Sequence, residues 1–371
     1  MKSQLILLII GVLCFATSSA SNSSSKGVME KIFEDYDKDL RPNHEGGPIE
    51  VSVSVYVNSF ANIDETSMEY KVYFYLRQYW KDDRLVGKVN HTLAMTGLSA
   101  SQLWKPDAYC ENARESNLAE ASDSVNSLVF LHPDGLVLYS RLSQVTAECK
   151  MDLRDFPMDT QKCNLVFGSY SYPTSDIVYK WRDDSAVEVG RRELAQFYFK
   201  SSQLASNTAV LSTGNFSLIS VHFLFERRLG YFLIQVYAPD IFIVMLSWIV
   251  FWMDRNDIGN RMALGITTIL TIMFLMGSIN AAMLRVSYPK ALDWYLMVSF
   301  TFIFLALFEC LIAYGIEISA SKSKTNSDLE YEEVQKEGKS VAYWIDYVSR
   351  ILFPSLFAVY NIYYWGLYEF T

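Results

Sequence analysis

The chain has 371 residues, of which 51% are apolar and 15% aromatic, and its formal net charge is −9. An acidic chain is a poor binder of nucleic acid, so that class of partner is excluded first. The sequence contains no nucleophile elbow, zinc motif, phosphate-binding loop or dinucleotide fingerprint, and its four histidines form no motif. We therefore expect neither an enzyme, nor a cofactor, nor a metal site.

Residues 1–20 have the order of a secretory signal peptide, with Lys2, then the apolar stretch LILLIIGVLCFA, then small residues at 18–20. We expect this segment to be removed and the following residues to enter the secretory lumen, where disulfides persist. The cysteines that then remain are Cys110, Cys149, Cys163 and Cys310. Glycosylation acceptor triplets begin at Asn22, Asn90 and Asn215, as expected for an extracellular first half.

Residues 21–229 are predicted to form an extracellular ligand-binding domain with an immunoglobulin-like β-sandwich. Apolar and polar residues alternate in VSVSVYVNSF (51–60), YKVYFYLRQYW (70–80), NSLVFLHPDGLVLYSRL (126–142) and FSLISVHFLFERR (216–228). Runs of period two that are separated by turns such as Pro133-Asp134-Gly135 are typical of antiparallel strands in a sandwich.

Four hydrophobic stretches follow, at 231–253, 262–284, 291–317 and 342–367. Each is near or above the roughly 20 residues that a bilayer-crossing helix needs. The fourth is rich in Tyr and Trp, which suit the bilayer interface. We expect transmembrane helices 1–3 in 230–318, a short cytoplasmic linker at 319–340, and helix 4 with an extracellular C-terminus in 341–371. The predicted fold class is a β + α membrane protein, with the sandwich followed by a four-helix transmembrane bundle.

Within the predicted sandwich domain lies the stretch CKMDLRDFPMDTQKC, from Cys149 to Cys163. No His or second cysteine pair lies nearby, which disfavours a four-ligand zinc site. We predict a disulfide, because closing a loop of this size stabilises a fold by on the order of 3 kcal/mol. The central Phe156-Pro157 is compatible with a cis peptide in a tight turn that presents one apolar residue and flanking acids.

This loop and six further stretches resemble, in order, the motifs of the Cys-loop, or pentameric ligand-gated, ion channels. The stretches are YLRQYWKDDRL (75–85), LWKPDAYCEN (103–112), DGLVLYSRL (134–142), ERRLGYFLIQVYAPD (226–240), LGITTILT (264–271) and RVSYPKALD (285–293). The last two favour the anionic branch of glycine and γ-aminobutyric-acid receptors. The resemblance implies a plasma-membrane subunit that assembles with four further subunits, a homopentamer being favoured, and that opens a central pore when a small-molecule agonist binds.

In that family the agonist lies between two subunits in a box of aromatic residues, because a π face attracts an ammonium group. The resemblance places Tyr109, Tyr170, Leu211, Thr213 and Phe216 on the principal face, and Tyr75, Arg77 and Ser140 on the complementary face. Arg77 resembles the arginine that holds an agonist carboxylate, a role that suits a planar guanidinium. Any of these residues could instead be core packing, which is what we expect for Trp80 and Trp104.

Two departures from the family pattern affect this site. Gly168 stands where the glycine-receptor branch has an acid ahead of its central aromatic, and Leu211 stands where an aromatic is usual. The adjacent cysteine pair of nicotinic subunits is also missing. These differences predict a ligand with an anionic end and more apolar surface than glycine, or a cavity that has lost its transmitter. Cys110, beside Tyr109, is expected to be a buried free thiol.

The second hydrophobic span is expected to line the pore. Ala263, Thr267, Leu270, Phe274, Gly277 and Ala281 recur at spacings of three and four and so share one helical face, with Asn260 at its cytoplasmic end. The alternative is a buried contact between helices. Leu270 resembles the family's gate leucine, which blocks ions by dewetting, and Phe274 is a candidate second constriction.

Ion selectivity is assigned from the same span. Asn260 stands where cation channels usually have Glu, which favours anions. The Pro-Ala of anion channels is also missing, and Asp257 lies close by. We expect a chloride-type channel, with a cation channel of the same family and a non-conducting, partner-dependent subunit as alternatives.

The resemblance also implies a coupling region between the agonist site and the pore. Its expected members are Asp64, Phe156, Pro157, Asp159, Arg227 and Tyr288, with Arg285 close by. We expect Phe156-Pro157-Met158 to pack against the connection at 286–289. Opposed charges in such a region can bias two states by about 1–3 kcal/mol.

Overall fold

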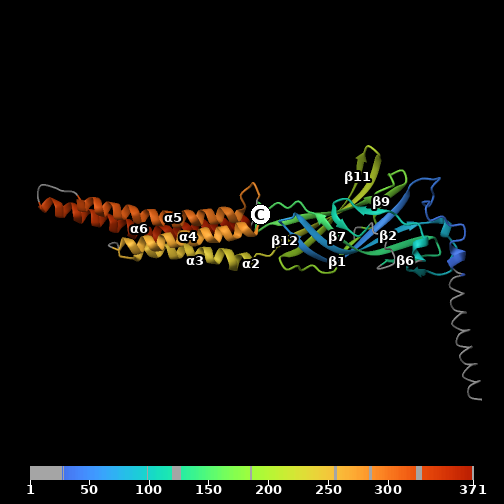
Figure 1. Cartoon of the computed structure of the whole chain (residues 1–371), viewed down its shortest axis with the longest axis horizontal. Helices are drawn as coiled ribbons and strands as arrows, with labels where there is room; N and C mark the ends of the chain where they lie inside the picture. The colour runs from blue at the N-terminus through green and yellow to red at the C-terminus, as the bar shows by residue number, and fades with distance from the viewer. Residues whose placement is uncertain are drawn as a thin grey trace, which may run out of the picture. The chain divides into compact units, whose positions relative to one another are not determined.

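The computed structural model describes residues 27, 29–97, 99–118, 127–183, 186–254, 257–283, 286–322 and 328–369. The expected signal peptide, Asn22 and Arg285 lie outside these residues. The chain divides into two compact units (Figure 1). Residues up to Lys150 together with Lys162–Phe225 form the first unit, and Met151–Gln161 together with the chain from Glu226 onward form the second.

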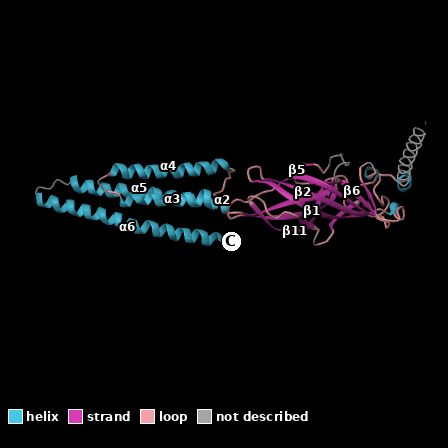
Figure 2. Ribbon diagram, turned by 90° about the horizontal axis from the view of Figure 1, so that it is seen from below, coloured by secondary structure: helices cyan, strands magenta, loops and turns pink. Residues whose placement is uncertain are grey.

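Two β-sheets make up the first unit (Figure 2). The larger sheet has the order β10-β1-β2-β7-β6-β3, with β5 beside β7 and β9 beside β1, and the smaller has the order β11-β12-β8-β4. The larger sheet contains β1 (Ile49–Asp64), β2 (Glu69–Lys81), β3 (Leu93–Met95), β5 (Ala113–Ser116), β6 (Ser127–Leu131), β7 (Leu136–Glu148), β9 (Ile177–Trp181) and β10 (Val187–Val189). The smaller contains β4 (Ala108–Cys110), β8 (Thr160–Ser169), β11 (Phe197–Leu211) and β12 (Gly214–Arg227). Short 3₁₀ turns lie at η1 (Asp83–Leu85) and η2 (Ala100–Gln102).

The core of the first unit follows from the alternation in the sequence. Successive side chains of a strand point to opposite faces, so β1 buries Val51, Val53, Val55 and Val57 while the residues between them point outward. Between the sheets, the ring of Phe60 meets those of Phe225 and Phe223 edge to face, with centroids 4.9 and 5.0 Å apart. Trp80 and Trp104 are buried, as predicted. This arrangement confirms the predicted β-sandwich.

The second unit is a bundle of four helical segments (Figures 1 and 2). The first runs through α2 (Gly230–Phe232), η3 (Leu233–Tyr237), α3 (Ala238–Trp248) and η4 (Ile249–Trp252). The others are α4 (Ile258–Ala282), α5 (Ala291–Lys322) and α6 (Asp328–Glu369). The turn η3 is a π-helix that ends two residues before Pro239, whose missing N–H interrupts the regular α-helical hydrogen bonds.

Each helix contributes one residue to the centre of the bundle. Val244 of α3, Ile272 of α4, Ile303 of α5 and Phe357 of α6 form a buried cluster, and Trp248 and Phe302 pack around it. The rings of Phe302 and Phe357 meet edge to face at 5.3 Å. The fourth helix is therefore fixed to the bundle by apolar packing.

The fourth helix differs from its prediction in two respects. Within the described residues, three helices are long and apolar enough to cross a bilayer, namely Gly230–Trp252, Ile258–Ala281 and Ala291–Ile316. The helix α6 contains the stretch 342–367, but its many Tyr and Trp residues lower its hydropathy. It also begins at Asp328, inside the segment 319–340 that was expected to be a linker, and α5 extends to Lys322. Glu, Lys and Gln are abundant in that segment and favour helix, which explains the extension.

Candidate functional site

The residues expected on the principal face all lie on or beside the smaller sheet. Tyr109 of β4 pairs with Gly168 of β8, and its ring meets that of Tyr170 edge to face at 5.9 Å. Tyr170 is 77% exposed. Leu211, Thr213 and Phe216 lie in the hairpin between β11 and β12, where Leu211 and Thr213 are exposed and Phe216 is half-buried.

Asp107 holds the loop that presents Tyr170, a role that was not predicted from the sequence. One carboxylate oxygen accepts a hydrogen bond from the hydroxyl of Ser169 at 2.5 Å, and the other accepts one from the backbone N–H of Ser171 at 2.6 Å. The hydroxyl of Ser169 in turn accepts from the N–H of Tyr172 at 2.9 Å. The sequence WKPDAY contains Asp107, but only the fold shows that it faces the loop on the next strand.

We expect Asp107→Ala to raise the half-maximal agonist concentration about tenfold. Each lost charge-assisted hydrogen bond is worth about 1.5–3 kcal/mol, and part of that stabilisation keeps the loop of Tyr170 ordered. The measurement is the half-maximal agonist concentration in voltage-clamp recordings. Asp134→Ala, in a turn where the carboxylate accepts one hydrogen bond from the N–H of Leu136, is the control. Equal shifts for both variants would contradict the role of Asp107.

Packing explains why position 168 is glycine. A Cβ at Gly168 would lie 2.5 Å from Cδ2 of Leu218 and 3.2 Å from the carbonyl oxygen of Ser217. An acidic side chain at this position would therefore require Leu218 and the neighbouring backbone of β12 to shift. Next to Tyr109, the Cys110 thiol is buried, as predicted, and burial raises its pKa to about 12. Burial, followed by the charge of Glu111, also raises the pKa of Tyr109 above its usual value.

The residues expected on the complementary face lie side by side on the outer face of the larger sheet. Arg77 of β2 pairs with Ser54 on one side and with Ser140 of β7 on the other. Tyr75 lies on the same face, two residues from Arg77, and is 37% exposed.

Tyr56 of β1 joins this group and was missed from the sequence. It pairs with Tyr75, and their ring centroids are 6.2 Å apart. The guanidinium carbon of Arg77 lies 5.9 Å from the centroid of Tyr56. The alternation in VSVSVYV already places Tyr56 outward, but its neighbour across the strands depends on the register, which the sequence does not specify.

The two groups of expected ligand-binding residues are thus on different sheets. Among the described residues, no ring contact, hydrogen bond or ion pair joins a member of one group to a member of the other. Each sheet therefore contains only part of the predicted set.

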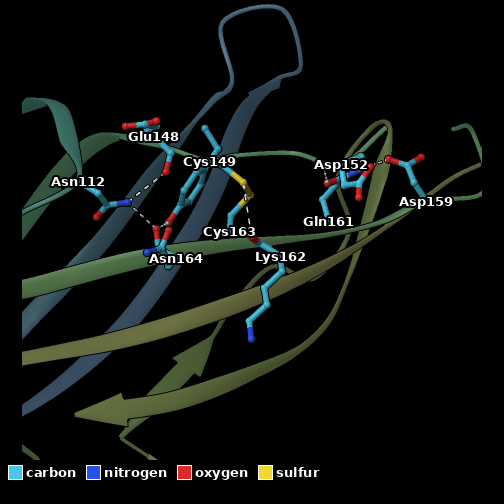
Figure 3. Close-up of a disulfide and its surroundings, with 10 residues drawn as sticks. Asn112, Glu148, Cys149, Asp152, Asp159, Gln161, Lys162, Cys163 and Asn164 are labelled. Carbon is cyan, nitrogen blue, oxygen red and sulfur yellow. Dashed lines mark hydrogen bonds between the residues drawn. A yellow bond between two sulfur atoms is a disulfide. The ribbon is translucent and has the colours of Figure 1, made fainter. Parts of the chain in front are cut away.

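The predicted disulfide is confirmed (Figure 3). Cys149 directly follows β7 of the larger sheet and Cys163 lies in β8 of the smaller, and both are buried. Beside it, the side-chain amide of Asn112 donates to the carbonyl oxygens of Glu148 at 3.1 Å and Asn164 at 2.9 Å. The disulfide therefore links the two sheets. Asn112 provides hydrogen-bond donors to the backbone carbonyl groups beside each cysteine.

Within the second unit, the loop enclosed by the disulfide forms a buried ion pair. Nε of Arg227 donates to Oδ1 of Asp159 at 2.7 Å and Nη2 donates to Oδ2 at 3.1 Å, and the two side chains are 1% and 2% exposed. The side-chain amide of Gln161 donates to the same carboxylate and to the carbonyl oxygen of Asp152 (Figure 3). The guanidinium carbon of Arg227 lies 4.7 Å from the centroid of Phe156.

The tip of this loop packs against the helices of the same unit, at places that differ in part from the prediction. Phe156, next to a cis Pro157, is buried with its ring edge to face with Phe232, 4.8 Å between centroids. From the connection at 286–289, the hydroxyl of Tyr288 accepts a hydrogen bond from the N–H of Leu153 at 3.1 Å. Phe156 itself receives a backbone hydrogen bond from Leu292. The apolar side chain that contacts Phe156 is thus Phe232. Phe232 lies in α2, at the start of the first helix, which closely follows the end of β12.

Asp64 and the glycosylation candidates lie in the first unit. The Asp64 carboxylate accepts hydrogen bonds from the N–H of Thr66 and the hydroxyl of Ser67, each at 2.8 Å, and these bonds lower its pKa. The Asp64 carboxylate therefore stabilises the turn between β1 and β2 through these two hydrogen bonds. Asn90 and Asn215 are exposed, so both are accessible.

In the single chain, the expected pore face of α4 is exposed along its whole length. Asn260, Ala263, Thr267, Leu270, Phe274, Gly277 and Ala281 are all exposed. Leu270 and Phe274 are 64% and 79% exposed. The opposite face buries Arg261, Thr268 and Ile272. The alternative that this face is a contact within one subunit therefore finds no support among the described helices.

Charged groups at the start of α4 are engaged within the chain. Asp257 is the N-cap residue, and its carboxylate accepts hydrogen bonds from the backbone N–H and the side-chain amide of Asn260. Arg261 is buried, and its Nη2 lies 3.0 Å from Oδ2 of Asp346 in α6 and donates to the carbonyl oxygen of Met253. Arg261 thus anchors α6 instead of facing outward with Asn260.

The sandwich, the linking disulfide and the helical bundle define a class of membrane receptor, and comparison with known proteins gives the family. The chain matches the family described as "Neurotransmitter-gated ion-channel ligand binding domain" over residues 25–229 and the "Neurotransmitter-gated ion-channel transmembrane region" over 236–323. It is 35% identical to γ-aminobutyric acid receptor subunit beta-4 of Gallus gallus, over 93% of this chain and 73% of the relative. It is 32% identical to subunit alpha-2 of Bos taurus and of Homo sapiens, over 92% of this chain and 88% of each relative.

The chain therefore belongs to the neurotransmitter-gated ion-channel family. It is a ligand-gated ion-channel subunit of the type related to γ-aminobutyric acid receptors, and members of this family are membrane receptors and not enzymes. They act as pentamers gated by small-molecule agonists.

Proposed function

We propose that this chain forms a homopentameric, anion-selective channel in the plasma membrane, opened by an agonist that binds between neighbouring subunits. The observation that supports the intersubunit site most directly is the separation of the two groups of ligand-binding candidates. Tyr109, Tyr170 and Phe216 belong to one sheet, and Tyr75 and Arg77 belong to the other. A ligand held by both groups would have to lie between the first face of one subunit and the second face of its neighbour.

The chemistry of the two faces indicates the kind of agonist. The rings of Tyr109 and Tyr170 offer π faces to an ammonium group, and Arg77 beside Ser140 offers hydrogen bonds to a carboxylate. The relatives are named for γ-aminobutyric acid, which has one ammonium and one carboxylate. We propose an amino-acid agonist with an ammonium group and at least one carboxylate, with additional contacts to Leu211 and Thr213.

The pore of the proposed channel is lined by α4. Its exposed face has no charged side chain between Asn260 and Ala281. Leu270 and Phe274 project from this face and are the candidate constrictions, since a ring of apolar side chains can stop ions by dewetting. The contacts of Phe156, Asp159, Arg227 and Tyr288 within the second unit support a role for the disulfide-closed loop in gating.

Selectivity for anions is supported by the start of α4. Asn260 is neutral, and the carboxylate of Asp257 already accepts two hydrogen bonds from Asn260. An acid that caps a helix offers less free negative charge to a passing cation than an acid that points into the pore. In the proposed topology, Asn260 is at the cytoplasmic end, Asn90 and Asn215 are extracellular glycosylation sites, and the C-terminus is extracellular.

The test is voltage-clamp recording from cells that express this chain alone, with chloride and sodium replaced in turn. We expect a reversal potential that follows chloride, and we expect Asn260→Glu to move it toward the sodium potential, because a ring of five acids at this end attracts cations. Asn280→Gln, at the other end of α4, is the neutral control. A wild-type reversal potential that follows sodium would contradict anion selectivity, and the absence of current from protein at the cell surface would favour a partner-dependent subunit.

A further inference from the structure

The outer face of the larger sheet presents a second arginine that is stacked on an aromatic ring. Arg182 directly follows β9, and its guanidinium carbon lies 4.1 Å from the centroid of Tyr79. Tyr79 lies two residues beyond Arg77 on β2, so both side chains point to the same face. The backbone of Arg182 is fixed, because its N–H donates to the carbonyl oxygen of Val53 at 3.0 Å.

Neither guanidinium is paired with a carboxylate of the described residues on this face. Ser52 and Ser54 are the β1 partners of Tyr79 and Arg77, and Leu138 and Ser140 are their partners on β7, so these four adjacent positions are uncharged. Further out, Lys180 is the β9 partner of Ser52 and is paired with Glu50, and Glu188 of β10 is the partner of Tyr56. In the part of the chain that the structure describes, neither Arg77 nor Arg182 forms an ion pair. Asp183, the next residue after Arg182, lines a separate hollow of about 510 Å³ with Trp181 and Leu204.

We infer that Arg182 is a second anion-binding residue of the agonist site, and that the agonist class has two anionic groups, as in a dicarboxylic amino acid. The inference rests on the proposed function, in which Arg77 holds the first carboxylate. A guanidinium that stacks on a ring keeps its edge free for bidentate hydrogen bonds to a carboxylate. Arg182 stacks on the ring of Tyr79, and Tyr79 is about 7 Å from Arg77 along β2, so we expect a ligand with two carboxylates to reach both guanidinium groups.

Glutamate and γ-aminobutyrate form a matched pair of probes, because they differ by one carboxylate. Their binding is measured on the purified full-length protein from the rise in melting temperature with ligand concentration. We expect the wild-type protein to bind glutamate about tenfold more tightly, the effect of one additional charge-assisted hydrogen-bonded contact. We expect Arg182→Gln to remove this preference while leaving γ-aminobutyrate binding unchanged, and Arg77→Gln to weaken the binding of both.

Arg192→Gln is the control, since Arg192 is an exposed arginine in the next connection, between β10 and β11. Arg182→Lys should restore only part of the preference, because an ammonium group does not stack and chelate as a guanidinium does. The inference is overturned if Arg182→Gln weakens both probes equally or neither, or if neither probe stabilises the wild-type protein. Binding with the expected preference but without current would contradict only the proposed channel activity.

Discussion

Arg227→Leu is expected to destabilise the protein by about 3–5 kcal/mol, because it leaves the carboxylate of Asp159 buried without its cation. The pair is almost fully enclosed and hydrogen-bonded in two places, so water cannot replace the missing guanidinium. The measurements are the melting temperature of the solubilised protein and the fraction of the chain that reaches the cell surface. Both should fall sharply for Arg227→Leu and for Asp159→Leu.

The same loop provides a matched control. Nε of Arg154 lies 3.3 Å from Oδ2 of Asp152, but the two side chains are 71% and 61% exposed. An exposed pair of this kind contributes about 0–1 kcal/mol, so Arg154→Ala should leave both measurements nearly unchanged. The double variant Arg227→Leu with Asp159→Leu should be more stable than either single variant, since it buries no unpaired charge. Additive losses in the double variant would show that the two residues do not act as a pair.

Leu270→Thr is expected to lower the agonist concentration needed for half-maximal current by about 5–150-fold, which corresponds to a coupling change of about 1–3 kcal/mol. In the proposed pentamer, five Leu270 side chains face the axis, and a hydroxyl on each would make the constriction easier to wet. The closed state would lose more stability than the open one. We also expect current without agonist, measured as the fraction that a pore blocker removes.

Met273→Thr is the control for this experiment. Met273 is 52% exposed in the single chain but lies beside the face that contains Leu270 and Phe274. The same hydroxyl there should leave the agonist dependence close to that of the wild type. If both variants shift it equally, polarity anywhere on α4 is sufficient, and Leu270 is not the gate.

The sandwich could be predicted from the sequence because its strands alternate strictly, as in β1 and β2, and because turns such as the one at Gly135 interrupt the alternation. The first three helices could be predicted from their apolar length. The start of α6 could not, since a charged stretch that favours helix has no apolar signal to distinguish it from a linker. The low hydropathy of α6 reflects aromatic residues, which pack well in a bundle although transfer scales give them low values.

A candidate for the site could be proposed from the sequence where a single residue type is distinctive, as for Arg77 and Tyr170. Tyr56, Asp107 and Arg182 were missed because their roles depend on pairing between strands that are distant in sequence. Tyr56 acquires its role from the register with β2, and Arg182 from the position of β9 beside β1. The burial of Arg261 was also not predictable, since its partner Asp346 is 85 residues away.

The disulfide-closed loop has a practical consequence for work on the ligand-binding half. Residues 151–161 connect β7 to β8 and include the first two residues of β8, yet their contacts belong to the helical unit. A soluble fragment that ends at Arg227 would keep the loop but lose its contacts with Phe232 and Tyr288. Phe156 and Pro157 would then form an exposed apolar patch on the fragment. Such a fragment should self-associate, and replacing Phe156 with a polar residue is the first change to make before studying agonist binding to the isolated domain.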